Sequence, residues 1–444
     1  MKTRYLACAM IMSVSMGGCS ESGGRSENSA VSTTLAAASV TEEAQTTFRS
    51  STPSPIPPWV PETVGTIDGG LGNIDAIAFA PDGTAVAFSL IDTSCCSNRV
   101  VGWAKNAGGT WKKIDAETAG FVVGADGLGA YGGPTEVIWF DGRFVAVGTR
   151  GGQSEPERAS TSVTWVSGDG LSWRAYDDTT GSRMSGLAVS PDGTSLLGVR
   201  TTEEGAAEIR STTDGASWTT VARVTSGKAG TVLSSLSLAR VSRGAEATRY
   251  VLFGSWFETT ADGASRTGPF AAISEDGRSW NPVDLTVPPT ATPQSVTMTN
   301  AVMLDASLIL YGFGYGGAGD DDVTQFAWRS IDMSTFEQLS VSEPCGGTIT
   351  SVVADQRAPE PTMFAVCSVV VGPVEGDSVD IRTTLVISRN GAQFEVAPVR
   401  PPDLGEPSVE VNLGPLITRP NGAVTIAVAK PGAPDVRTVT VWTS

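Results

Sequence analysis

The chain has 444 residues and no histidine, which limits the catalytic chemistry that it can perform. Histidine is the commonest general base and imidazole metal ligand, so Ser-His-Asp, Cys-His and zinc-hydrolase schemes are excluded. Carboxylate and tyrosine chemistry remain. We single out Asp75 and Glu136, with Tyr131 and Arg183 near them in the expected fold. Two carboxylates beside one opening could act as acid and base or bind a cation. The alternative is that they are solvated charges at strand ends.

Four cysteines follow the N-terminal segment: Cys95, Cys96, Cys345 and Cys367. Four cysteines allow three disulfide connectivities. We favour a Cys345–Cys367 bridge, because these two residues flank one predicted hairpin. Cys95 and Cys96 then form either a vicinal disulfide or a reactive pair. Because the chain has no histidine and no Cys-x-x-Cys, we expect no metal site and no cofactor.

A short phrase that recurs six times indicates the elements that position these residues. Three clean copies read Asp-Gly-x-Ser-Trp, at 169–173, 214–218 and 276–280, and degenerate copies lie at 106–111, 332–336 and 390–394. Internal repetition at this spacing is typical of propellers and solenoids. The defining positions of the five stronger copies are Asp169, Trp173, Asp214, Trp218, Asp276, Trp280, Asp332, Phe336, Asn390 and Phe394.

The phrase has a mechanical interpretation. Asp or Asn accepts hydrogen bonds from the backbone N–H groups just ahead of it, and Gly takes the positive φ of a tight turn. The aromatic residue begins the next strand and offers a large apolar face. The phrase resembles the Asp-box, or bacterial neuraminidase repeat, found between the third and fourth strands of propeller blades. The resemblance implies a sialidase-like propeller fold with structural boxes.

The resemblance does not imply neuraminidase activity, since propellers serve many functions. Neuraminidases also carry an Arg-Ile-Pro-like motif near the N-terminus, and this chain has no Arg-Ile-Pro. We therefore assign no catalytic residue.

Asp-Gly and Asn-Gly turns recur out of phase with the boxes and should join the first and second strands of each blade. Both markers together predict an all-β chain of four-stranded antiparallel blades. The strands expected in two successive blades are 136–140, 143–149, 162–167 and 173–176, then 186–190, 195–201, 207–212 and 218–222. Six boxed blades and one unboxed blade give a seven-bladed propeller. Six blades is the alternative if the 106–111 copy is not a true box.

The final blade is one strand short in the sequence. Strands are expected at 409–413, 423–429 and 436–442, after which the chain ends. An unpaired edge would favour aggregation. The segment 62–67 is a spare strand before the first blade, so we expect it to complete the last blade and close the ring.

The N-terminal segment predicts a lipoprotein. Residues 1–18 resemble a signal peptide, with Lys2 and Arg4 before a short apolar stretch, and residues 15–19 resemble a bacterial lipobox ending in Cys19. Cys19 would carry the lipid, palmitate included; the alternative is an ordinary cleaved signal peptide. Residues 19–61 cannot bury enough apolar surface to fold, so we expect a disordered tether. The propeller should span 62–444.

The net charge of −17 argues against nucleic acid as a partner. No later segment reaches the roughly 18 apolar residues of a membrane span, so membrane contact should run through the lipid only. We expect an extracytoplasmic, lipid-anchored monomer. It should act as a non-enzymatic binding or scaffolding module for an envelope protein or glycan. The alternative is a carbohydrate-active enzyme, sialidase-like or another glycosidase, with carboxylates at the channel mouth.

Overall fold

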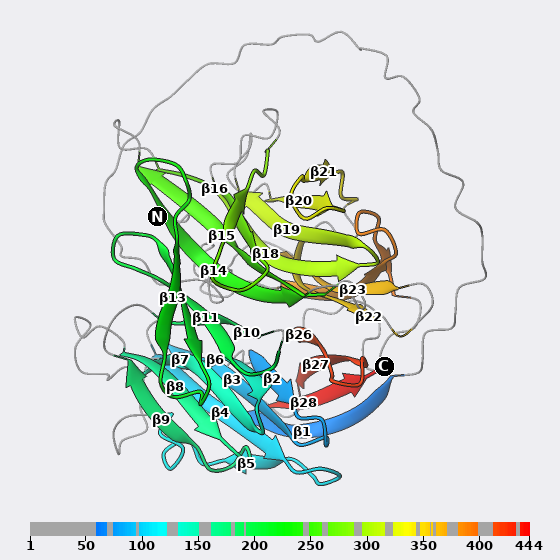
Figure 1. Ribbon diagram of the computed structural model, residues 1–444. Helices are drawn as coiled ribbons and strands as arrows, with labels where there is room; N and C mark the ends of the chain where they lie inside the picture. The colour runs from blue at the N-terminus through cyan, green and yellow to red at the C-terminus, as the bar shows by residue number, and fades with distance from the viewer. Residues whose placement is uncertain are drawn as a thin grey trace. The chain divides into compact units, whose positions relative to one another are not determined.

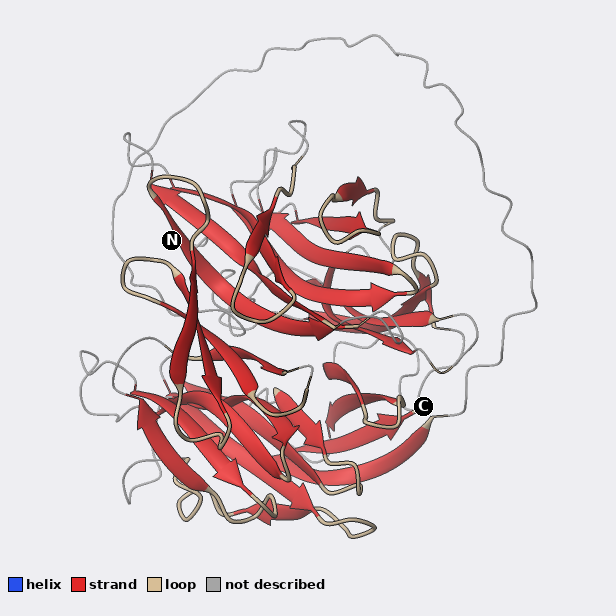
Figure 2. Cartoon of the chain, in the orientation of Figure 1, coloured by secondary structure: helices blue, strands red, loops and turns tan. Residues whose placement is uncertain are grey.

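The structure is a computed structural model that describes residues 59–444 outside a set of short gaps. The gaps are 69–73, 95–96, 122–131, 151–160, 179–182, 191, 243–247, 260–264, 288–294, 316–322, 343–346, 356, 358–360, 371–380, 398–411 and 432–435. All regular structure in the described residues is β-strand (Figure 2). Cys19, the signal peptide and the predicted tether lie outside these residues.

Every strand belongs to one of seven four-stranded antiparallel sheets. Blade one contains β2 (Ala76–Phe79), β3 (Ala85–Ser94), β4 (Ser97–Lys105) and β5 (Lys112–Ile114). Blade two contains β6 (Gly132–Phe140), β7 (Arg143–Arg150), β8 (Thr161–Ser167) and β9 (Arg174–Asp178). Blade three contains β10 (Ser185–Val189), β11 (Leu196–Thr201), β12 (Ala207–Thr212) and β13 (Thr219–Val224).

Blades four to six follow the same order. Blade four contains β14 (Thr231–Val241), β15 (Arg249–Thr259), β16 (Ser265–Ser274) and β17 (Asn281–Val283). Blade five contains β18 (Ser295–Leu304), β19 (Ser307–Tyr315), β20 (Val323–Ser330) and β21 (Glu337–Leu339). Blade six contains β22 (Thr348–Asp355), β23 (Thr362–Val370), β24 (Ile381–Ser388) and β25 (Glu395–Val396). Blade seven contains β26 (Asn412–Thr418), β27 (Val424–Pro431), β28 (Val436–Thr443) and β1 (Val60–Asp68).

The seven sheets form a closed ring (Figure 1). Their first strands contact one another in chain order, from β2 through β6, β10, β14, β18 and β22 to β26, and β26 contacts β2 again. The chain is therefore a seven-bladed β-propeller, as predicted, and the six-bladed alternative is wrong.

The N-terminal strand closes the ring. β1 pairs antiparallel with β28, from Val60 opposite Thr443 to Asp68 opposite Val436, and the two run side by side in Figure 1. The predicted closure is confirmed, with a strand longer than the expected 62–67. Trp59, just before β1, is buried between blades six and seven, whereas Val64 and Ile67 are buried between blades seven and one. The strand thus supplies side chains to two inter-blade cores.

Successive side chains of a strand point to opposite faces of its blade, and each face is covered by a neighbouring blade. Each strand therefore contributes side chains to two inter-blade cores. In β3, Val86 and Phe88 pack in the core shared with blade two. Ala85, Ala87 and Ile91 face the core shared with blade seven. This two-sided burial explains why the second strands contain nearly continuous apolar runs.

Polar side chains join neighbouring blades near the start of the first strands. Each is a hydroxyl or amide oxygen on a third strand that accepts the backbone N–H of a residue at or beside the next blade's first strand. The pairs are Ser162 with Met184, Thr267 with Val296, Gln325 with Ile349 and Thr383 with Leu413. The first strands are therefore positioned by hydrogen bonds as well as by packing.

Candidate functional site

The Asp-box residues stabilise turns between third and fourth strands. Asp169 Oδ1 accepts from the N–H groups of Leu171 (2.8 Å) and Ser172 (2.7 Å), and Ser167 Oγ accepts from Gly170 N–H (2.8 Å). The same two backbone bonds recur at Asp214, Asp276, Asp332 and Asn390. In the weak copy, 106–111, the described bond is from Gly109 N–H to the Asn106 carbonyl. Each box thus stabilises its own turn.

The box glycines hold each turn against the preceding blade. Gly277 has φ of +72°, and a Cβ there would lie 2.5 Å from Leu197 of blade three. A side chain is therefore excluded for both conformational and packing reasons. Equivalent close approaches join Gly170 to Val86, Gly215 to Val145 and Gly391 to Ile309.

The box tryptophans differ in how fully they are buried. Trp173 is 8% exposed and packs edge-on against Phe88, with Phe121 covering it from the β5–β6 connection. Trp218 and Trp280 are partly exposed. The covering aromatic explains the deeper burial of Trp173. Phe336 and Phe394 are also half-buried.

The structure uses the predicted channel-mouth carboxylates to hold backbone amides. Glu136 does not open its strand as predicted, because β6 begins four residues earlier, at Gly132. Its two oxygens accept from Gly186 N–H and Leu187 N–H of β10, each at 2.6 Å. Asp75 is exposed just before β2 and accepts from Leu90 N–H at 2.6 Å.

The electrostatics of Glu136 distinguish it from a solvated charge. Burial raises its pKa, while the two N–H donors and the charge of Arg183 favour the ionised form and offset part of that rise. Burial lowers the pKa of Arg183, and Glu136 opposes this. Glu136 and Arg183 are thus brought together, and Glu136 ties blade two to blade three. Tyr131 lies outside the described residues.

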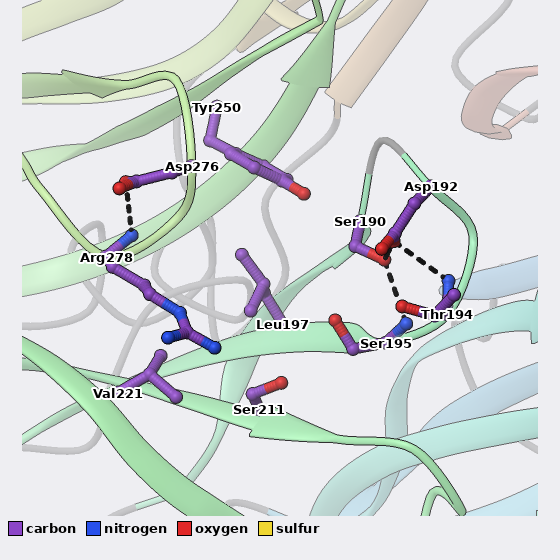
Figure 3. A pocket seen from close by; sticks show the side chains of 10 residues that line it. All are labelled: Ser190, Asp192, Thr194, Ser195, Leu197, Ser211, Val221, Tyr250, Asp276 and Arg278. Atoms are coloured by element: carbon purple, nitrogen blue, oxygen red, sulfur yellow. Dashed lines mark hydrogen bonds between the residues drawn. The ribbon is translucent and has the colours of Figure 1, made fainter.

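A more open site lies between blades three and four, at the opposite ends of the strands (Figure 3). It is a cavity of about 320 Å³ beside the β10–β11 turn and the box of blade four. Its lining residues are Ser190, Asp192, Thr194, Ser195, Leu197, Ser211, Val221, Tyr250, Asp276 and Arg278. We call this the blade 3–4 pocket. It combines hydroxyls, two carboxylates and a guanidinium with the apolar side chains of Leu197 and Val221.

A small residue opens this pocket. Ser211 pairs with Leu197 in the register of β11 and β12. The register-equivalent residues on the third strands of blades two, four and six are Val166, Ile273 and Ile387, and blade five carries Arg329 there. Replacing an aliphatic side chain by serine removes the volume that fills the same position in those blades.

The pocket carboxylates are ionised. A hydrogen bond from Ser190 and one from Thr194 N–H lower the pKa of Asp192 to about 2. The N–H groups of Ser279 and Arg278 lower that of Asp276 to about 2. Neither is suited to donate a proton near neutral pH, so neither carboxylate of this pocket can serve as a general acid.

Tyr250 contributes an unusual hydroxyl to the pocket. The residue is 0% exposed, yet no group in the described part of the chain hydrogen-bonds to its hydroxyl. Burial raises its pKa to about 12, so the phenol stays protonated. Figure 3 shows the hydroxyl end directed toward the turn that carries Ser190 and Asp192. Buried polar groups normally have partners, so an unpaired one at a cavity indicates a missing ligand or solvent.

The remaining predicted residues fall partly outside the described chain. Cys367 is disulfide-bonded, but Cys95, Cys96 and Cys345 are not among the described residues, so its predicted pairing with Cys345 stays a prediction. Within the described ranges, no three His, Cys, Asp or Glu residues gather as metal ligands. Those same ranges hold no helix able to cross a bilayer.

Sequence reasoning missed the residues that line the pocket. Arg278 and Asp276 were visible only as parts of a box, and Tyr250 lay inside an unremarked strand. A signal existed, because the position of Arg278 is Leu171 in blade two and Ala216 in blade three. Comparing the boxes with each other would have identified the charged exception.

The likenesses to known proteins are to solved structures, not to families or curated sequences. The sequence matches no protein-family model and no curated protein. Among solved structures, the β-propeller domain of the Trilobed protease from Pyrococcus furiosus is 9% identical, with a TM-score of 0.45 and coverage of 84% of this chain and 95% of that chain. The Penicillium chrysogenum α-L-arabinanase complexed with arabinobiose is 13% identical, with a TM-score of 0.40 and coverage of 87% and 98%. The α-L-arabinofuranosidase Arb93A from Fusarium graminearum is 15% identical, with a TM-score of 0.41 and coverage of 68% and 89%. These likenesses concern the fold alone.

Proposed function

We propose that this protein is a lipid-anchored, extracytoplasmic propeller that binds a glycan in the blade 3–4 pocket. The observation that carries the proposal is the buried, unpaired hydroxyl of Tyr250 at a cavity lined by hydroxyls, carboxylates and Arg278. Ligand sites combine apolar walls with a few convergent polar groups, and known sites begin at about 300 Å³. The cavity is near this lower limit, which suits one or two sugar units. The anchor at Cys19 would present the propeller outside the cytoplasm.

The geometry favours binding over hydrolysis in this pocket. Glycoside hydrolysis requires one carboxyl group that remains protonated until it donates to the leaving oxygen. Asp192 and Asp276 both have a pKa lowered to about 2, so both are ionised at neutral pH. They can accept hydrogen bonds from sugar hydroxyls but cannot supply that proton.

The experiment is a glycan-array screen of the intact lipoprotein in detergent, followed by titration calorimetry on any glycan that binds. The test variant is Ser211→Ile, which fills the cavity with the residue that blades four and six carry at this position. We expect Ser211→Ile to melt at or above the temperature of the parent protein and to lose glycan binding. The proposal fails if no glycan binds, or if Ser211→Ile binds as well as the parent protein.

A glycosidase at the channel mouth is the second candidate, and the raised pKa of Glu136 favours it. A general acid needs a pKa raised toward the working pH. Against this, both oxygens of Glu136 accept backbone N–H groups. Release of nitrophenol from a panel of aryl glycosides, abolished by Glu136→Gln in folded protein, would establish this activity. No release from any member of the panel would count against it.

A further inference from the structure

The repeated blades allow the pocket residues to be compared with their equivalents in the same molecule. Tyr250 begins the buried part of β15 and lies 3.4 Å from a Cβ built on Gly277, the box glycine of its own blade. Phe144 holds the same relation to Gly170 in blade two, at 3.6 Å. A phenylalanine therefore suffices for packing here, and the hydroxyl of Tyr250 is an addition.

Two more pocket residues are more polar than their equivalents in other blades. Arg278 replaces the Leu171 of blade two, and Ser190 replaces the Ala80 that opens the matching Pro-Asp-Gly-Thr turn of blade one. Each change adds a polar side chain to the lining, although the Ser190 hydroxyl also bonds within its own turn, to Asp192 and Ser195. With Ser211 in place of an aliphatic residue, four independent positions depart from the repeat around one space.

The guanidinium of Arg278 is available to a ligand. Among the described residues it makes no ion pair or side-chain hydrogen bond, although the Arg278 backbone N–H donates to Asp276 Oδ1 at 2.8 Å. Figure 3 shows the guanidinium beside Val221 and Leu197, at the edge of the cavity. A guanidinium presents five N–H donors in a planar fork that can engage two neighbouring oxygens at once.

The charge of the lining selects against acidic ligands. Asp192 and Asp276 contribute two negative charges and Arg278 one positive charge, so the lining residues have a net charge of −1 (−2 + 1). The whole chain carries −17. An anionic ligand would meet the net negative charge of the lining as well as that of the whole chain.

We propose, on the basis of the glycan-binding function above, that the blade 3–4 pocket recognises a neutral sugar unit through adjacent hydroxyls. One hydroxyl oxygen accepts from Arg278 and its neighbour accepts from the Tyr250 hydroxyl, while the sugar O–H groups donate to Asp192. A hydroxyl both donates and accepts, so two adjacent ones satisfy the donors and the acceptor together. A carboxylate would satisfy only the donors and would approach two aspartates.

The test measures binding of matched glycosides that differ at C6, where a hydroxymethyl group is replaced by a carboxylate. The probes are methyl glucoside against methyl glucuronide and methyl galactoside against methyl galacturonide, titrated into the full-length protein in detergent and followed by ligand-detected NMR. We expect a neutral member of the panel to bind at least about tenfold more tightly than its acidic counterpart. Tyr250→Phe and Arg278→Leu, which copy blade two, should each weaken it by about tenfold, the factor expected for one hydrogen bond of about 1.4 kcal/mol.

The outcomes separate this inference from the function on which it rests. If the acidic member binds equally or better, and Ser211→Ile abolishes that binding, the pocket binds glycans but the neutral-sugar assignment is overturned. If no sugar binds and Ser211→Ile changes nothing, the proposed function itself fails. Unchanged melting temperatures for Tyr250→Phe and Arg278→Leu show that a loss of binding is not a loss of fold. Neutral binding that both variants leave intact would overturn the assigned contacts.

Discussion

Deleting residues 59–68 from the full-length protein should open the ring. The segment buries three apolar side chains, since Trp59 is 6% exposed, Val64 4% and Ile67 0%. Burying each such side chain is worth about 1.5–3 kcal/mol, or about 5–9 kcal/mol together. Propeller-sized domains are typically stable by only about 5–15 kcal/mol. The loss would therefore consume most of the folding free energy, in addition to exposing β28 along its whole edge.

The assay is size-exclusion chromatography with light scattering, followed by thermal melting. We expect the deleted protein to form oligomers or aggregates, because β28 presents unpaired backbone groups. A synthetic peptide of residues 59–68 added during refolding should restore monomer by occupying the vacant edge. Glu62→Gln is the matched control, since it keeps the strand and removes only charge interactions, with Lys105 at 2.5 Å and with Arg419, and it should leave the protein monomeric. A deleted protein that stays monomeric and melts like its parent would refute the closure argument.

Three further outcomes are expected. Cys19→Ser should move the protein from membranes into the soluble fraction without changing its melting temperature, and persistence on salt-washed membranes would contradict the lipobox. Asp214→Ala should lower the free energy of unfolding by about 1–3 kcal/mol in a denaturant titration, because it removes the acceptor of two backbone N–H groups. Asp214→Asn copies Asn390, which keeps these bonds, and should lower the free energy of unfolding by less in the same titration. Because the pKa of folded Asp276 is lowered from 3.8 to about 2, its stabilising contribution is present above pH 3.8 and lost as pH falls through 2. Asp276→Asn should therefore flatten acid unfolding in that window, and an unchanged acid profile would show that this carboxylate is not responsible.

The fold was predictable because its determinants are local. A turn such as Asp192-Gly193 or Asp276-Gly277 specifies its hairpin through bonds spanning two or three residues. The alternating apolar runs between such turns then predict most of the strand boundaries. The closure by β1 followed from counting strands, since an unpaired β28 would be unfavourable. Boundaries were less certain, as the earlier start of β6 at Gly132 shows, because Gly133 and Pro134 carry no strand propensity of their own.

The candidate site was not predictable in the same way, because it depends on contacts across blades. Glu136 was identified as a polar residue of an innermost strand, but nothing local showed that Gly186 and Leu187 would lie within hydrogen-bond distance. The blade 3–4 pocket likewise joins the β10–β11 turn to the box at Asp276, which is more than eighty residues away in the chain. Periodicity gives the strands, whereas the angle and spacing of neighbouring blades decide which side chains share a cavity.

Because the blades of this protein repeat, each position can nevertheless be compared with the equivalent positions in the other blades. Where the same backbone environment occurs several times, packing favours similar residues, as at Val166, Ile273 and Ile387, although blade five carries Arg329 there. Ser211 departs from the aliphatic residues by leaving a cavity, which costs stability because contacts are lost. Tyr250 buries a hydroxyl without a partner, which also costs stability. The two departures lie on neighbouring blades and face one space, so a ligand that filled the cavity and bonded the hydroxyl would offset both costs.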